Sequence, residues 1–154
     1  MPSLQPSELI EKIERESQLN EKQRFAFRII TDHFIQTHVR KEPKQVNQLS
    51  MLMTGPGGTG KAHVVRAVQR VMEHYSCGHL IRFLAPTGSA AALIEGMTVH
   101  KALGIKINSE DYTVLISVRE RSKLREEWKN VEYILLDETS LLGLELLAEI
   151  DHSL

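Results

Sequence analysis

Apolar residues recur at helical spacing in two segments near the start of the chain. In residues 7–18 they share one side of a helix and charged residues fill the other side, which predicts a short amphipathic helix. In residues 20–38 apolar residues recur at i, i+3 and i+7, and Asn20 is a residue type that caps helix N-termini. The chain is therefore expected to begin with two consecutive helices.

Beyond residue 47 the pattern changes, because short apolar runs begin to alternate with helical segments. The predicted strands are residues 48–55, 79–86 and 131–137. The predicted helices are residues 61–75, 89–96, 98–104 and 114–130, with a last one at the end of the chain. Alternation of this kind is typical of βαβ units, in which helices cover both faces of a parallel sheet. The predicted fold class is α/β.

The composition excludes some classes of protein but does not indicate a function. The chain has 154 residues and a formal net charge of −1, so any contact with nucleic acid depends on a local basic surface. Its single cysteine, Cys77, cannot form an intrachain disulfide, which favours a reducing, intracellular location. The sequence shows no membrane-length apolar run, and the acidic residues at its start argue against a secretory or mitochondrial signal.

The strongest chemical signal is a glycine-rich segment between a predicted strand and a predicted helix. It comprises Gly55, Pro56, Gly57, Gly58, Thr59, Gly60 and Lys61. This is the spacing of a phosphate-binding loop, in which glycines let successive N–H groups point at one anion and the lysine reaches the β- and γ-phosphates. The alternative is a plain glycine-rich turn between a strand and a helix.

Position 62 departs from the phosphate-loop pattern. The pattern has Ser or Thr after the lysine because its hydroxyl ligates Mg²⁺, and this chain has Ala62. Water can replace the missing ligand, since Mg²⁺ usually keeps several waters, whereas Thr59 is poorly placed to do so. Nucleotide binding is expected, and two interpretations of Ala62 stay open: a tolerated substitution, or a functional loss of hydrolysis.

The predicted strand at residues 131–137 ends in two carboxylates, Asp137 and Glu138. In phosphate-loop proteins an acidic strand end of this kind lies beside the nucleotide. Asp137 would then hold Mg²⁺ and Glu138 would polarise the attacking water. An ordinary strand-to-turn transition has the same local sequence, so the interpretation depends on the upstream glycine-rich loop.

Five segments occur in an order that resembles a known family. They are Leu19–Gln23, the glycine-rich loop, Ala85–Ala91, Gly96–His100 and Leu136–Ser140. Together they resemble the first motor domain of RecD-like, Pif-type superfamily 1 DNA helicases, including those of helitron-type transposons, over roughly residues 19–142. The resemblance implies a RecA-like parallel sheet, incomplete at its C-terminal end, in residues 19–154, preceded by the amphipathic helix in residues 1–18.

The resemblance also implies roles for individual residues. Gln23 matches the glutamine that contacts adenine, although it also fits a helix capping box. Thr87 and Gly88 match a segment that contacts the single-stranded DNA backbone, and Thr98 and His100 match a following DNA-side segment. For Thr87 the alternative is a simple helix cap, and for His100 it is a structural histidine.

The activity implied by the resemblance is ATP hydrolysis, with Mg²⁺, coupled to 5′-to-3′ movement on single-stranded DNA. It further implies roles in DNA repair, recombination and telomere maintenance, and a nuclear location in a eukaryote. The family's Gly-Asp-x-x-Gln motif and second motor domain do not occur in these 154 residues. We therefore expect that this chain alone does not unwind DNA. The alternative function is a nucleotide-binding module with impaired catalysis. The sequence does not indicate the oligomeric state.

Overall fold

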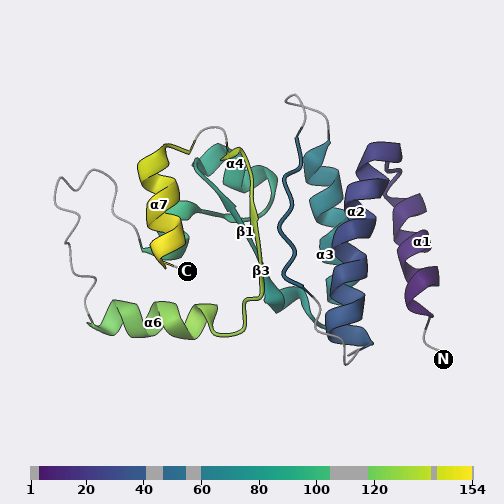
Figure 1. Cartoon of the computed structure of the whole chain (residues 1–154), viewed down its shortest axis with the longest axis horizontal. Helices are drawn as coiled ribbons and strands as arrows, with labels where there is room; N and C mark the ends of the chain where they lie inside the picture. The colour runs from purple at the N-terminus through teal and green to yellow at the C-terminus, as the bar shows by residue number, and fades with distance from the viewer. Residues whose placement is uncertain (1–3, 41–46, 55–59, 105–117, 140–141, 154) are drawn as a thin grey trace. The chain divides into compact units, whose positions relative to one another are not determined.

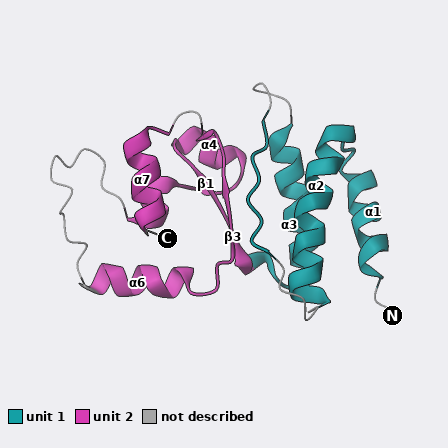
Figure 2. Ribbon diagram, viewed as in Figure 1, with its two compact units in different colours: residues 1–78 teal, residues 79–154 magenta. Residues whose placement is uncertain are grey.

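The computed structural model describes residues 4–40, 47–54, 60–104, 118–139 and 142–153. The chain divides into two units, residues 1–78 and 79–154, which Figure 2 shows in different colours. Each unit has a core of its own. Among the described residues, no helix combines the length and the apolar character that a bilayer crossing requires.

The described secondary structure of the first unit is entirely helical (Figure 1). It contains α1 (Pro6–Glu16), α2 (Glu21–Phe34), the π-helical continuation η1 (Ile35–Val39) and α3 (Lys61–His74). Helix α2 packs against both α1 and α3. The largest fully buried side chains of this unit are Phe27, Phe34, Met72, Val64, Val68 and Val71. The helices predicted at residues 7–18, 20–38 and 61–75 are therefore confirmed.

Ion pairs join α1 to both of its neighbours. The buried Glu14 carboxylate accepts a hydrogen bond of 2.7 Å from Arg28 Nε on α2 and lies 3.7 Å from Arg24. On the other side Glu16 pairs with Arg70 of α3. The hydrogen bond from Arg70 lowers the pKa of Glu16, and the bond to Glu14 raises the pKa of Arg28. These contacts hold α1 against α2 and α3.

The strand predicted at residues 48–55 is wrong. Residues 47–54 form neither strand nor helix, and the Leu52 side chain is 74% exposed. A strand needs a neighbour to pair its backbone N–H and C=O groups. The described part of the first unit contains no other strand, so the apolar run has no partner strand to pair with.

The second unit contains the sheet. Its strands are β1 (Ile81–Ala85), β2 (Met97–Thr98) and β3 (Tyr133–Leu136), all parallel, in the order β2-β1-β3. The strands predicted at residues 79–86 and 131–137 are confirmed. Strand β2 was not expected, because two residues are too short to show a period.

The described part of the second unit also contains helices. They are α4 (Gly88–Leu93), α5 (Val99–Leu103), α6 (Val118–Trp128) and α7 (Leu144–Ser153), and a 3₁₀ turn, η2 (Gly78–Leu80), precedes β1. The core of this unit comprises Leu84, Val99, Ala102, Leu103 and Ile150. Parallel strands connected through helices confirm the predicted α/β class.

Candidate functional site

Gly60, the described residue at the end of the glycine-rich loop, directly precedes helix α3. Gly60 has a φ of +80°, a left-handed conformation that glycine adopts without strain, and Lys61 is the first residue of the helix. The Gly60 carbonyl accepts a hydrogen bond of 3.0 Å from the His63 N–H, and Lys61 and Ala62 are half-buried. The other predicted loop residues, Gly55, Pro56, Gly57, Gly58 and Thr59, lie outside the described residues.

Gln23 joins the beginnings of two helices. Its Oε1 accepts a hydrogen bond of 2.9 Å from the Asn20 N–H, and its own N–H donates to Asn20 Oδ1 at 2.9 Å. The capping box is therefore present at the start of α2. In addition, Gln23 Nε2 donates to the Gly60 carbonyl at 3.2 Å, and sequence analysis missed this contact. Its two residues are 37 positions apart, so no local pattern indicates it.

In the second unit, three predicted site residues lie along one edge of the sheet. Thr98 pairs with Ala85 at the ends of β2 and β1. Asp137 directly follows β3, and its N–H donates to the Leu84 carbonyl of β1 at 2.8 Å. Thr87 comes two residues after β1. Since neighbouring strands are about 4.8 Å apart, Thr98 and Asp137 are separated by about 10 Å across β1.

The two carboxylates after β3 differ in their backbone. Asp137 Oδ1 accepts a hydrogen bond of 2.9 Å from the Glu138 N–H. Glu138 has a φ of +50°, which is unfavourable for a residue with a Cβ by about 1–2 kcal/mol. Asp137 is half-buried and Glu138 is exposed. Strained backbone often accompanies functional positions, and here it turns the chain immediately after the sheet edge.

The predicted DNA-side threonines are helix caps. Thr87 Oγ1 accepts a hydrogen bond of 3.3 Å from the Ala90 N–H of α4, and Thr98 Oγ1 accepts one of 3.3 Å from the Lys101 N–H of α5. The capping alternative for Thr87 is therefore confirmed, and the cap formed by Thr98 is one that sequence analysis missed. Thr87 is exposed, and Thr98 is half-buried. Gly88 is exposed as the first residue of α4, and His100 is half-buried in α5.

Asp137 is the predicted magnesium ligand. Mg²⁺ is commonly held by one or two carboxylates together with phosphate oxygens and water, so Asp137 fits this role. Ala62 adds no oxygen. Across the described ranges no group of three or more His, Cys, Asp and Glu side chains could enclose a metal ion by itself. A magnesium site made from the described residues would therefore need further ligands, such as phosphate oxygens and water.

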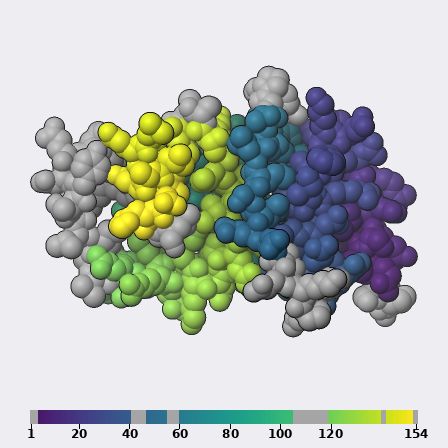
Figure 3. Space-filling model, viewed as in Figure 1, coloured from purple at the N-terminus to yellow at the C-terminus, as the bar shows by residue number. Residues whose placement is uncertain are grey.

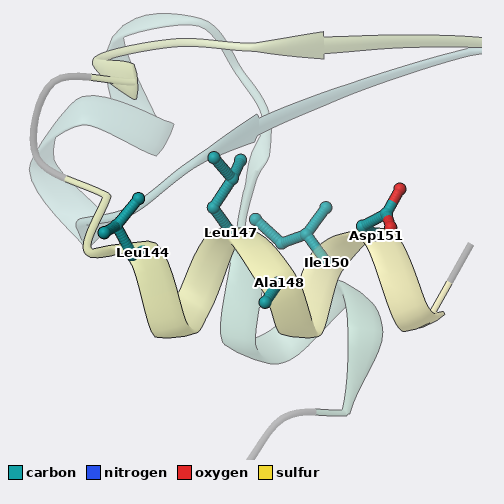
Figure 4. A pocket seen from close by; sticks show the side chains of 5 residues that line it. All are labelled: Leu144, Leu147, Ala148, Ile150 and Asp151. Atoms are coloured by element: carbon teal, nitrogen blue, oxygen red, sulfur yellow. The ribbon is translucent and has the colours of Figure 1, made fainter.

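Two surface hollows do not involve the predicted site residues. One, of about 480 Å³, follows helix α7 and is lined by Leu144, Leu147, Ala148, Ile150 and Asp151 (Figure 4). Helix α7 is the yellow segment of the visible face in Figure 3, and its Leu144 is 86% exposed. The other, of about 410 Å³, lies between α1 and α3 and includes Arg70. Neither combines a phosphate-binding turn with a carboxylate.

The chain has a left-handed glycine turn that is followed by a lysine at a helix start. It also has a parallel sheet in which strand β3 is followed by two carboxylates. These features define the class of α/β phosphate-loop nucleotide-binding proteins. Within this class the chain belongs to the PIF1-like helicase family, which it matches over residues 18–154. The family predicted from the ordered motifs is thereby confirmed.

The relatives of this chain are much longer proteins. It is 33% identical over 106 residues to the ATP-dependent DNA helicase PIF1 of Saccharomyces cerevisiae, which covers 68% of this chain and 12% of the relative. It is 30% identical over 119 residues to the Emericella nidulans PIF1 helicase, covering 75% and 16%. For human PIF1 the identity is 26% over 102 residues, covering 66% and 15%. No solved structure matches the chain.

Proposed function

We propose that this chain binds ATP and single-stranded DNA as part of an ATP-dependent 5′-to-3′ DNA helicase. The turn at Gly60, which places Lys61 at the start of α3, is the observation that carries the proposal. The N–H groups and the dipole at a helix start favour phosphate, and the lysine adds a positive charge. Membership in the PIF1-like helicase family supports both ATP and DNA as ligands.

In this proposal each nucleotide-side residue has one task. Lys61 contacts the β- and γ-phosphates, Asp137 holds Mg²⁺, and Glu138 polarises the attacking water. Gln23 contacts adenine. The full set of nucleotide-binding residues is Gln23, Gly55, Pro56, Gly57, Gly58, Thr59, Gly60, Lys61 and Ala62. The magnesium ion would supply charge neutralisation at the phosphates when bound.

The proposed DNA contacts are Thr87, Gly88, Thr98 and His100. Thr87 and Gly88 follow β1, and Thr98 ends β2, so three of the four lie near one edge of the sheet. Exposed hydroxyls and backbone N–H groups contact the phosphates of nucleic acids without reading base sequence. A helicase that moves along any sequence requires this kind of contact. The processes we propose for the complete helicase are DNA repair, recombination and telomere maintenance, in the nucleus if the source is eukaryotic.

Ala62 supports a second candidate, a nucleotide-binding module with impaired hydrolysis. It is the second residue of α3, the position from which a hydroxyl would reach the metal, and it has no oxygen to offer. If this absence limits the site, Ala62→Ser will increase the dependence of ATP binding on Mg²⁺. Titration of labelled ATP with and without Mg²⁺ measures the effect, and equal dependence in both proteins would refute it.

Steady-state ATP hydrolysis with and without single-stranded DNA separates the two candidates. An impaired binding module binds ATP but shows no DNA-stimulated turnover in the wild-type chain, and Ala62→Ser restores part of it. Robust stimulated turnover in the wild-type chain would contradict the module and favour the helicase. Absence of ATP binding in both proteins would contradict both candidates.

A further inference from the structure

The side chain of Gln23 contacts the turn that begins α3. Its Nε2 donates a hydrogen bond of 3.2 Å to the Gly60 carbonyl, in a part-buried position. A Cβ added at Gly60 would collide with the same Nε2 atom. The carboxamide therefore packs directly against the face of the turn on which Gly60 has no side chain.

The orientation of this carboxamide is fixed from its other end. Gln23 Oε1 accepts the Asn20 N–H, which assigns the oxygen to the start of α2 and leaves the nitrogen toward Gly60. The backbone of Gln23 is fixed as well, because its N–H donates to Asn20 Oδ1. Helix α2, which carries Gln23, also packs against α3, the helix that begins after Gly60.

We propose that Gln23 is a positioning residue for Lys61, in addition to its proposed contact with adenine. By holding the Gly60 carbonyl, it fixes the left-handed turn from which Lys61 and α3 begin. This inference rests on the proposed function, since it assumes that Lys61 contacts phosphate. It differs from adenine recognition in one consequence: loss of Gln23 weakens binding of the phosphates themselves.

Inorganic tripolyphosphate tests this consequence, because it carries the phosphate chain of ATP without a base. The dissociation constants of ATP and of tripolyphosphate are measured by calorimetry on the whole chain and on Gln23→Met. Met keeps the length of the side chain but cannot donate to Gly60. We expect tripolyphosphate binding to weaken about three- to tenfold, as for the net loss of one hydrogen bond, and ATP binding to weaken by at least as much, because ATP also loses the proposed adenine contact.

Asn20→Ala is the matched control. It removes the Asn20 Oδ1 bond and weakens the start of α2, but it leaves the Asn20 N–H and the Gln23 donor in place. We expect its affinity for tripolyphosphate to stay within about twofold of wild type. If Gln23→Met melts below the assay temperature, Gln23→Asn replaces it, since this side chain is polar but one methylene shorter.

The outcomes separate the roles. Weaker ATP binding with unchanged tripolyphosphate binding in Gln23→Met would overturn the positioning role and leave adenine contact alone. An equal loss in Asn20→Ala would overturn it too, because the effect would then come from the helix start. Lys61→Ala tests the proposed phosphate contact on which this inference rests. If tripolyphosphate binds Lys61→Ala and wild type equally well, or binds neither protein, the proposed function itself fails.

Discussion

At the scale of single residues, the proposed site uses side chains that also have structural tasks. Thr87 caps α4 through its hydroxyl, and Gln23 completes the capping box of α2 while it reaches Gly60. A substitution that removes either side chain is therefore expected to change both the local stability and the proposed ligand contact. The effect on stability and the effect on ligand binding can be separated by variants that keep the helix cap and change only the side chain's charge or its hydrogen-bond donor.

Thr87 allows such a separation. Asn and Asp are both good N-caps, so Thr87→Asn and Thr87→Asp preserve the start of α4. The Asp variant adds a negative charge where we propose that a DNA phosphate lies. We expect Thr87→Asp to weaken binding of a labelled oligothymidylate several-fold, about 1 kcal/mol or more, and Thr87→Asn to change it little. Fluorescence anisotropy at low and moderate salt measures both, and equal affinities of the two variants would contradict the phosphate contact.

The sequence predicts part of the site at this scale, and physical reasons explain the remainder. The glycine at position 60 and the lysine after it predict a left-handed turn at a helix start, which the structure contains. The bond from Gln23 to Gly60 depends on how α2 packs on α3, and neither segment encodes that packing by itself. The positive φ of Glu138 is likewise invisible, because a glutamate at a turn gives no local signal for it.

At the scale of elements, apolar runs predict strands only where a partner strand exists. The runs that became β1 and β3 pair with each other directly. The apolar run within residues 47–54 also predicts a strand but forms none, in a unit whose described secondary structure is helical. Pairing is a property of two segments, so the pattern of one segment cannot decide it.

Gly96 determines how closely the chain entering β2 approaches β1. A Cβ at this position would collide with the Phe83 carbonyl, which belongs to the backbone of β1 and cannot move aside. We expect Gly96→Ala to reduce the free energy of unfolding by about 1–3 kcal/mol. Gly88→Ala is the control, because nothing lies within 4 Å of its added Cβ. Urea denaturation followed by circular dichroism compares them, and equal stabilities would contradict the close approach.

The ion pair between Glu16 of α1 and Arg70 of α3 predicts that the stability of the fold depends on pH. Arg70 lowers the pKa of Glu16 from its ordinary 4.5, so the ion pair contributes stability above that value and loses it as the pH falls through the lowered pKa. The melting-temperature difference between wild type and Arg70→Met should therefore shrink as the pH falls below 4.5 and through the lowered pKa of Glu16. In a Glu16→Gln background Arg70→Met should show no such trend. A difference that stays constant with pH would show that Arg70 acts through another contact.

At the scale of the whole molecule, the two units divide the proposed chemistry between them. The first unit contains the turn at Gly60 with Lys61, and the second contains the sheet edge with Asp137. The match to the PIF1-like helicase family runs through both. The boundary between residues 18 and 19 and the role of every site residue stay predictions. Because its curated relatives are far longer, the motor activity of a complete helicase is a proposal for this chain.

The affinity of ATP for wild type and for Lys61→Ala tests the central claim most directly. The control is Lys22→Ala, which removes the same charge from an exposed position on α2. Calorimetric titration should show saturable binding of ATP to wild type and to Lys22→Ala. It should show a loss of about ten- to a hundredfold in Lys61→Ala, as for charged hydrogen bonds to phosphate. Equal ATP affinity in all three proteins would contradict a phosphate site at Lys61 and with it the proposed function.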